Sequence, residues 1–324
     1  MKTKNMTTLH FRNSTVPSRR SGTVAKKQMK TITKFVYTAF AAFVLAIGAL
    51  SANGAPGHLF ASINAPGNGS ASIHQYTPSG VQSTFVSGLS RPRGLAFDSV
   101  GNLFVATTFC FFTCESTILK ITPNGTQSTF ATFATDLFAE GVLTDGADNV
   151  FVDAVNIDDP RFASTIFEFA PDGTQSTFGS VPGQSFGPAL DSAGNLYVPC
   201  NVCRTIYKFT PDGTRSVFVR PAAFTHDQGP LVLAFDGFGN LFVSTTNGAI
   251  LKFTPEGVES TFATGLNQPL GLAFDRAGNL FVTEGGNTPP GDILKFTPDG
   301  VGTVFAAVST GVNSGPEFLA FQPR

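Results

Sequence analysis

The sequence has no tryptophan, few charged residues and no acidic residue among its first 55 positions. Charged residues make up only 13% of the chain, yet after residue 50 no apolar run approaches the ~20 residues of a membrane-spanning helix. Intrinsic disorder is excluded because a chain rich in phenylalanine and poor in charge can bury ample apolar surface. The H-E-x-x-H, P-loop and dinucleotide-binding motifs are also absent, so none of those catalytic classes is indicated.

The net charge of −1 conceals two parts of opposite charge. Residues 1–55 carry nine Lys or Arg residues and no Asp or Glu, so the rest of the chain carries 12 basic and 22 acidic residues, a net charge of −10. This acidic body has no stripe rich in Lys and Arg. Nucleic acid is therefore excluded as a partner, because neutralising phosphates requires clustered cations.

Residues 1–55 are predicted to be a signal peptide with a basic leader. An uncharged apolar run of 16 residues, 35–50, follows Lys34 and precedes small residues that end at Ala55. This order is typical of a secretory signal, and Met29 is an alternative start that would give a leader of ordinary length. We therefore expect residues 56–324 to be exported, to the periplasm or beyond, with no membrane attachment after cleavage. An uncleaved anchor is the alternative, although 16 apolar residues are short for a membrane span.

Three short patterns recur six times in the remaining chain. One is an aromatic residue or isoleucine followed by x-Pro-x-Gly, with its prolines at positions 78, 123, 171, 211, 255 and 298. The second is Ser-Thr-Phe or a variant of it. The third is Asn-Leu-Phe-Val or a relative, of which residues 58–61 are a degraded first copy. A period of about 40–45 residues indicates an array of identical supersecondary units.

Each repeat is predicted to contain four short strands. In the fullest copy they are residues 94–98, 102–108, 116–122 and 126–132, where apolar residues alternate or run together between turn residues. The first turn has a glycine suited to a left-handed position, and the Thr-Pro-x-Gly turn has a proline pre-set for a type I turn. We therefore assign the Asp residues of both turns a structural role only.

Six repeats of four strands predict an all-β fold, a six-bladed β-propeller with four antiparallel strands per blade. After the leader the chain begins at a second strand, residues 58–62, and the missing innermost strand is found at residues 317–322. We therefore expect the C-terminal strand to complete the first blade, forming a single domain over residues 56–324 without an unpaired edge. An open solenoid is the alternative, but it would need polar caps at its ends.

The repeat resembles the NHL-repeat propellers and, more broadly, the senescence-marker-protein/gluconolactonase superfamily and the streptogramin-lyase-like proteins. Three segments carry the resemblance: Gly-Leu-Ala-Phe-Asp-x-x-Gly-Asn-Leu-Phe-Val at 94–105 and 271–282, Ile-Leu-Lys-Phe-Thr-Pro-x-Gly at 250–257 and 293–300, and Ser-Thr-Phe-Ala-Thr-Gly-Leu at 260–266. The resemblance covers nearly all of residues 57–324. It implies the fold but no particular activity, since these families differ at the site.

The resemblance places ligands at the top of the central channel, where the innermost strands begin. One residue per blade is expected to form a ring there, half charged and half apolar. These predicted ligand-binding residues, for blades 1 to 6, are Glu317, Arg93, Glu140, Phe186, Leu231 and Leu270. The simplest interpretation of the charged half is an ion-pair cluster in which Arg93 bridges two carboxylates. The alternative is a ligand anchor or a metal site.

A divalent cation in the channel, calcium or zinc, is the cofactor that the resemblance suggests. Gluconolactonase relatives hold such a cation with Glu, Asn and Asp oxygens, and Glu317 and Glu140 match the glutamate position. The Asn and Asp positions are not matched. Asp153 and Glu284, just after second strands, could add oxygen ligands. A hard cation needs six or more oxygens, however, and a neighbouring arginine opposes it.

All four cysteines lie in loops predicted at the top face. An even number in an exported chain indicates disulfides, and the local pairings Cys110–Cys114 and Cys200–Cys203 are expected. A single zinc site with four thiolates is the alternative. It is disfavoured because a whole blade separates the two pairs.

These features favour an exported binding or interaction module, because no complete catalytic constellation is visible. Its partner is an unidentified protein or small molecule at the top face, and the protein is expected to be a monomer. The alternative is a metal-dependent gluconolactonase-like hydrolase or a streptogramin-lyase-like lyase. Its catalytic candidates are Glu140, Glu317 and His226, the last as a base beside Asp227.

Overall fold

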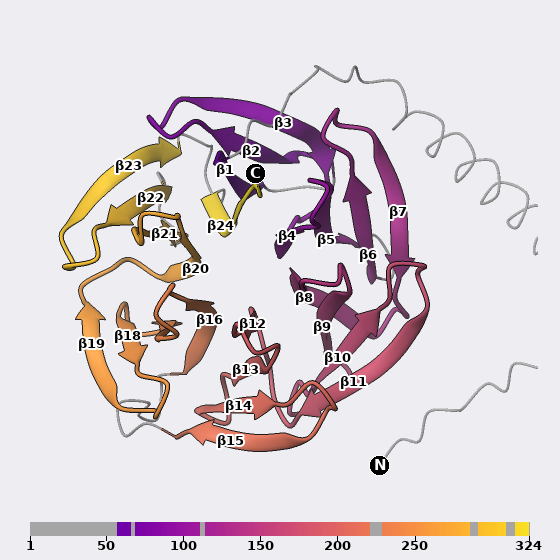
Figure 1. Ribbon diagram of the computed structural model, residues 1–324. Coiled ribbons are helices and arrows are strands. Elements are labelled where there is room, and N and C mark those ends of the chain that lie inside the picture. Colours follow the sequence, from indigo (N-terminus) through magenta and orange to yellow (C-terminus); the bar gives the residue numbers. More distant parts are fainter. Residues whose placement is uncertain are drawn as a thin grey trace, which may run out of the picture. The chain divides into compact units, whose positions relative to one another are not determined.

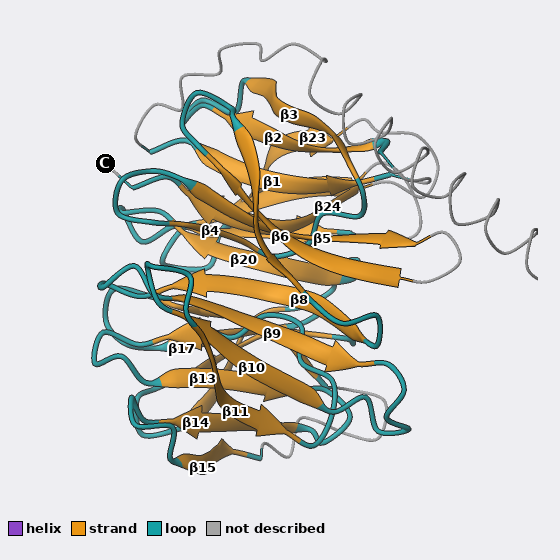
Figure 2. Cartoon of the chain, turned by 90° about the vertical axis from the view of Figure 1, so that its right-hand side faces the viewer, coloured by secondary structure: helices purple, strands orange, loops and turns teal. Residues whose placement is uncertain are grey.

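A computed structural model describes the chain from residue 57 onward with short gaps. The described residues are 57–65, 69–110, 114–220, 229–285, 291–308 and 315–323. They contain strands and turns and no helix, as the side view shows (Figure 2). Consequently no helix in this part of the chain could cross a membrane.

The described residues form 24 strands in six four-stranded antiparallel sheets, which follow one another around a central axis (Figure 1). The inner strands of blades 1 to 6 are β24 (Gly315–Phe321), β4 (Leu95–Phe97), β8 (Leu137–Thr144), β12 (Ala189–Leu190), β16 (Pro230–Phe235) and β20 (Pro269–Phe274). The second strands are β1 (Leu59–Asn64), β5 (Leu103–Cys110), β9 (Val150–Asn156), β13 (Leu196–Cys200), β17 (Leu241–Thr245) and β21 (Leu280–Glu284). The third strands are β2 (Ala71–Tyr76), β6 (Cys114–Ile121), β10 (Ser164–Phe169), β14 (Thr205–Phe209), β18 (Ile250–Phe253) and β22 (Gly291–Phe296). The outer strands are β3 (Gln82–Leu89), β7 (Gln127–Thr132), β11 (Gln175–Val181), β15 (Arg215–Val219), β19 (Glu259–Ala263) and β23 (Gly302–Val308).

The C-terminal strand completes the first blade, as the sequence predicts. Strand β24 pairs antiparallel with β1, with Phe321 opposite Leu59 at one end and Gly315 opposite Asn64 at the other. Beyond the strand, Gln322 N donates to the carbonyl oxygen of His58 at 3.1 Å. Both edges of β1 are therefore paired, and the ring is closed by main-chain hydrogen bonds rather than by contacts between side chains alone.

The turn between inner and second strands uses the carboxylate of its first residue. In blade 2, Asp98 Oδ1 accepts from the N–H of Asn102 at 2.7 Å, and Oδ2 accepts from the amide of the same residue at 2.6 Å. The same pair of bonds recurs at Asp145, Asp191, Asp236 and Asp275. Gly101 has a φ of 86°, which fits the left-handed position predicted for it. The structural role predicted for the carboxylates of this turn is thereby confirmed.

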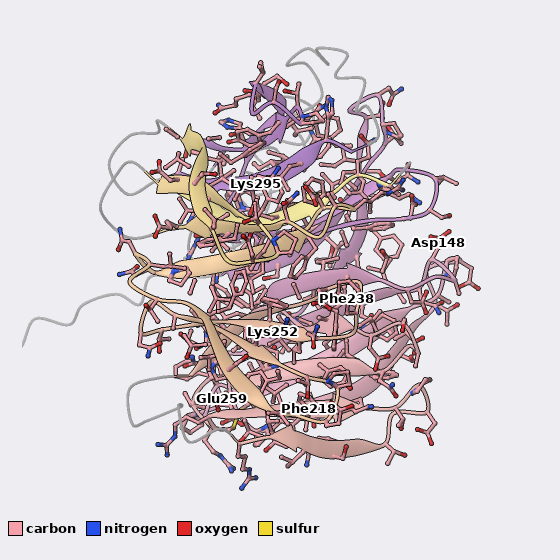
Figure 3. All side chains as sticks on the ribbon, turned by 60° about the vertical axis from the view of Figure 1, so that its left-hand side comes forward. Asp148, Phe218, Phe238, Lys252, Glu259 and Lys295 are labelled. Carbon is pink, nitrogen blue, oxygen red and sulfur yellow. A yellow bond between two sulfur atoms is a disulfide. The ribbon has the colours of Figure 1, made fainter. Side chains whose placement is uncertain are left out.

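Aromatic rings on the second strands join neighbouring blades. Phe242 of blade 5 meets Phe262 of its own outer strand edge-to-face, with centroids 5.0 Å apart, and Phe274 of blade 6 at 4.9 Å. Lys252 lies over the same ring, and Lys295 occupies the equivalent place in the next blade (Figure 3). Each such edge-to-face pair stabilises the fold by about 0.5–1.5 kcal/mol beyond the free energy gained from the apolar area that it buries. They explain how a chain without tryptophan fills the space between blades.

One of the two predicted disulfides lies among the described side chains. Cys200 and Cys203 are bonded, with their Cα atoms 5.1 Å apart at the end of β13. This bond removes two thiolates from the alternative zinc site. The side chains of Cys110 and Cys114 lie outside the described residues, so their pairing stays a prediction.

Candidate functional site

The charged half of the predicted ring forms one ion-pair cluster. Arg93 Nε donates to Glu140 Oε2 at 2.6 Å, and its Nη1 donates to Glu317 Oε2 at 3.0 Å. Asn64 Nδ2 donates to the other oxygen of Glu317 at 3.0 Å. The Arg93, Glu140 and Glu317 side chains are 17%, 9% and 16% exposed, so the cluster is largely buried but still reaches solvent. One guanidinium thus connects blades 1, 2 and 3.

The backbone around Arg93 fixes the direction of its side chain. Arg93 N donates to the Ala106 carbonyl at 2.8 Å, and Gly94 N donates to the Glu140 carbonyl of the next blade at 2.8 Å. The guanidinium carbon lies 5.8 Å from the ring centroid of Phe318. The two hydrogen bonds fix the backbone of Arg93, and the Phe318 ring packs against its guanidinium, so less entropy remains to be lost when the charged group binds its partners.

The sequence predicts that every ring residue precedes an inner strand, and this is wrong for four of the six. Arg93 and Phe186 do, but Glu140, Leu231, Leu270 and Glu317 lie within β8, β16, β20 and β24. In these four blades the register shifts at or near the ring residue, which marks a bulge. The inner strand therefore continues past the ring position, and the ring side chain is aimed by the bulge.

In these four blades a side chain of the second strand supports the bulge, and sequence reasoning missed these residues except Asp153. Ser62 Oγ accepts from Phe318 N at 3.0 Å, and Thr283 Oγ1 accepts from Gly271 N at 2.8 Å. Ser244 does the same in blade 5 and Asp153 in blade 3. A signal exists in the sequence, because Ser, Thr or Asp follows the Asn-Leu-Phe-Val pattern in these four blades.

The apolar half of the ring packs onto the central core. Phe186, Leu231 and Leu270 are partly buried against a cluster that includes Val232 and Phe318. Below the ring, inner segments of all six blades enclose a cavity of about 180 Å³, which opens to solvent. The mouth of the channel is therefore charged over blades 1 to 3 and apolar over blades 4 to 6.

Asp153 is the most deeply buried acid at this end of the channel. It is fully buried on β9, its Oδ1 accepts the N–H of Gly141, and its Oδ2 has no partner in hydrogen-bonding geometry. Burial raises the pKa of Asp153, although the nearby Ser185 hydroxyl, the Gly141 N–H and the Arg93 charge oppose this rise. The carboxyl group thus favours its neutral form more than an exposed aspartate does.

Glu140 is affected in the same direction. Burial raises the pKa of Glu140 to about 7, against the opposing charge and hydrogen bond of Arg93. The Asp153 and Glu317 carboxylates add to the rise. Burial lowers the pKa of Arg93, but both glutamates raise it and outweigh burial, so the guanidinium stays charged. The cluster therefore holds one permanent cation and one acid, Glu140, that binds a proton near neutral pH.

Other predicted site residues lie elsewhere. Glu284 ends β21 and accepts from the N–H of Asn267 at 2.7 Å, a contact that serves the loop between blades 5 and 6. His226 and Asp227 lie outside the described residues, so their proposed role as a base stays untested.

The residues at the mouth do not fit the divalent cation that the resemblance suggests. The Arg93 guanidinium lies between the two carboxylates that would have to bind the ion and donates a hydrogen bond to each, so the oxygens left over are fewer than the six or more that a hard divalent cation needs. Within the described parts of the chain, no group of three or more His, Cys, Asp or Glu side chains could hold a metal ion.

The pH dependence of stability is the first testable consequence. Because the pKa of Glu140 rises from 4.5 to about 7 on folding, the native state binds more protons than the unfolded state in this interval. The unfolding free energy contributed by Glu140 is thus fully present below pH 4.5 and falls as pH rises through about 7. Asp153 acts with the same sign. We expect a loss on the order of 2–3 kcal/mol between pH 5 and pH 8, measured by chemical denaturation.

A matched pair of variants isolates this effect. Glu140→Gln should flatten the pH dependence, whereas Glu259→Gln, at an exposed position on β19 (Figure 3), should leave it unchanged. A wild-type protein that gains stability from pH 5 to pH 8, relative to Glu140→Gln, would contradict the argument.

Comparison with known proteins reveals likeness in structure alone. No protein-family model and no curated protein matches this sequence. Among solved structures, a catalytically inactive virginiamycin B lyase from Staphylococcus aureus with quinupristin is 16% identical, with a TM-score of 0.55, and the match covers 80% of this chain and 87% of that one. A luciferin-regenerating enzyme is 16% identical, with a TM-score of 0.56 and coverages of 74% and 88%. Regucalcin from Agrobacterium tumefaciens, described as a calcium-binding protein, is 14% identical, with a TM-score of 0.56 and coverages of 71% and 83%.

These neighbours confirm the six-bladed propeller and its similarity to lyase-like and gluconolactonase-like structures. At such low identity they establish the fold alone, because one fold supports unrelated chemistry. The function of this chain must be argued from its own site.

Proposed function

We propose that this protein is an exported binding module whose ligand carries a cationic group beside an apolar one. The observation that supports this is the composition of the mouth, where one guanidinium is shared by Glu140 and Glu317. Asp153 adds a third carboxyl group behind them. Above about pH 7, where Glu140 is ionised, the two glutamates outnumber the single guanidinium, and apolar side chains form the opposite half of the mouth. Such a surface favours an amphiphilic cation over an anion.

The size of the channel limits how the ligand is held. A cavity of about 180 Å³ is smaller than the ~300 Å³ or more of a typical small-molecule pocket. We therefore place the ligand at the mouth, with only a short apolar group between Phe186, Leu231 and Leu270. A small molecule or one side chain of a protein partner meets this requirement.

Export is part of the same proposal. It rests on the basic and apolar leader and agrees with the Cys200–Cys203 disulfide, since such bonds persist in oxidising compartments. The net charge of −10 after the leader argues against nucleic acid as the partner. We propose that the exported form acts as a monomer.

A matched ligand series tests the binding proposal. Hexylamine, hexanol and hexanoate share one carbon skeleton and differ in charge, so their effects on the melting temperature isolate the electrostatic contribution. At pH 8, where Glu140 is ionised, we expect stabilisation in the order amine, alcohol, acid, because only the amine complements the excess of carboxylates over the guanidinium. Leu231→Ala should weaken amine binding by roughly tenfold, since a truncated apolar contact costs about 1–3 kcal/mol. Calorimetric titration measures the affinity.

Control measurements separate this proposal from the catalytic alternative. Val217→Ala, at an exposed position on β15, should leave binding unchanged. Equal stabilisation by amine and acid would contradict the proposed ligand chemistry. A divalent cation that co-purifies at one per chain and is lost in Glu317→Ala would instead favour a metal-dependent hydrolase.

A further inference from the structure

The position of Arg93 carries an inference beyond ligand binding. Its guanidinium donates to Glu140 on β8 and to Glu317 on β24, two carboxylates that belong to different blades on either side of it. Without a cation between them, two largely buried carboxylates would repel each other in a medium less polar than water. Once Glu140 is ionised, above about pH 7, the fold therefore needs a positive charge at this point.

An arginine meets this need permanently. Its guanidinium cannot lose its proton in a protein, and its planar array of donors can serve two carboxylates at once. The contacts from the backbone of Arg93 and from the Phe318 ring hold it in place. A metal ion would instead exchange with solvent and depend on its concentration.

We propose that Arg93 is a built-in cation, which occupies the position between Glu140 and Glu317, excludes divalent metal from it, and fastens the ring at its closure. Glu317 lies on the C-terminal strand, so its bond to Arg93 ties the strand that closes blade 1 to blade 2. Glu140 extends the same link to blade 3. The cluster thus links three blades through ion pairs. The two carboxylates form a cation-binding position that the arginine occupies in the wild-type protein.

Exchanging the built-in cation for a free one tests this proposal. Arg93→Gln removes the charge but keeps a polar side chain of similar length. In EDTA at pH 8 we expect its melting temperature to fall by roughly 5–10 °C, because one partner of a buried ion pair is lost. Adding 10 mM calcium chloride should recover part of this loss, because calcium binds carboxylate and amide oxygens together with water. The wild-type protein should respond to neither EDTA nor calcium.

Two further variants serve as controls. The triple variant Arg93→Gln, Glu140→Gln, Glu317→Gln lacks the carboxylates and should not respond to calcium. Arg93→Lys keeps the charge but not the fork of donors, so it should melt between the wild-type protein and Arg93→Gln and stay insensitive to calcium.

Three results would overturn the proposal. The first is a wild-type protein that calcium stabilises and EDTA destabilises, with Glu317→Gln abolishing both effects, since a metal would then share the site. The second is an Arg93→Gln variant that calcium stabilises no more than the triple variant. The third is Arg93→Lys melting as low as Arg93→Gln. If Arg93→Gln does not fold in EDTA, its refolding yield with and without 10 mM calcium decides the same question against the triple variant.

Discussion

Replacing Gly94 with alanine should destabilise the protein by about 3 kcal/mol or more, a large share of the 5–15 kcal/mol that stabilises a typical domain. A Cβ at this position would lie 2.5 Å from Val142 N, 2.7 Å from the Glu140 carbonyl oxygen and 2.8 Å from Gly141 Cα. All three atoms belong to the backbone of the next blade. They cannot move aside as the end of a flexible side chain would.

The same change should also disturb the ion-pair cluster. Gly94 N donates to the Glu140 carbonyl, and Arg93 is the preceding residue, so a displaced backbone separates the guanidinium from Glu140. Because the Arg93 charge lowers the pKa of Glu140, separating the two groups should raise that pKa further, so we expect Gly94→Ala to lose more stability between pH 5 and pH 8 than the wild-type protein does. Chemical denaturation at pH 5 and pH 8 measures both effects.

Gly146→Ala is the matched control. This glycine lies in the turn between β8 and β9, has no positive φ, and a Cβ there would meet no atom within 4 Å. Alanine should leave stability unchanged or raise it by about 0.4–1 kcal/mol, because it narrows the unfolded ensemble. Equal losses of stability in the two variants would show that replacing any glycine destabilises the protein, and would contradict the role given to the close approach of two blades at Gly94.

Removing residues 315–324 should have the largest effect of all. Without β24 the strand β1 loses its inner neighbour, and Arg93 loses Glu317. The backbone groups of β1 that pair with β24 would then form an exposed edge next to apolar core residues, a surface that promotes aggregation. We expect no cooperative unfolding transition and little soluble protein, as measured by circular dichroism and size-exclusion chromatography.

A permuted chain tests whether the truncation acts by removing strand β24 or by removing the C-terminal end of the chain as such. Residue 321 pairs with residue 59, so the end of β24 lies beside the start of β1. Placing residues 315–323 before Gly57 through a short flexible linker recreates an ordinary hairpin of the kind that the other five blades use. This protein should fold and melt close to the wild-type temperature. A permutant as unstable as the truncated chain would contradict the view that β24 acts through its pairing.

Much of this fold could be predicted because its determinants are local. The Asp-x-x-Gly-Asn turn is held by bonds within five residues, such as those from Asp98 to Asn102. The Thr-Pro-x-Gly turn is equally local, since Gly80 N donates to the Thr77 carbonyl at 2.9 Å. Short-range bonds of this kind leave a pattern that survives in each copy of a repeat, so blade number and closure could be read by counting.

The candidate site was predicted only in part. Ring membership follows from counting positions, and the ion-pair cluster was one of two interpretations of its charged half. The bulges could not be predicted, because they depend on side chains such as Ser244 and Thr283 that satisfy an N–H on a neighbouring strand. Asn64 was not foreseen as a partner of Glu317, from which it is 253 positions distant.

The sequence by itself therefore determined the architecture, namely six blades, four strands in each, and a first blade completed by the last strand. Only the tertiary structure decided what the charged residues do. Arg93 reaches Glu140 across 47 positions and Glu317 across 224, and no local pattern encodes such distances. Repeats specify a backbone through bonds between near neighbours, whereas a charge acts on whatever the closed ring brings within a few ångströms of it.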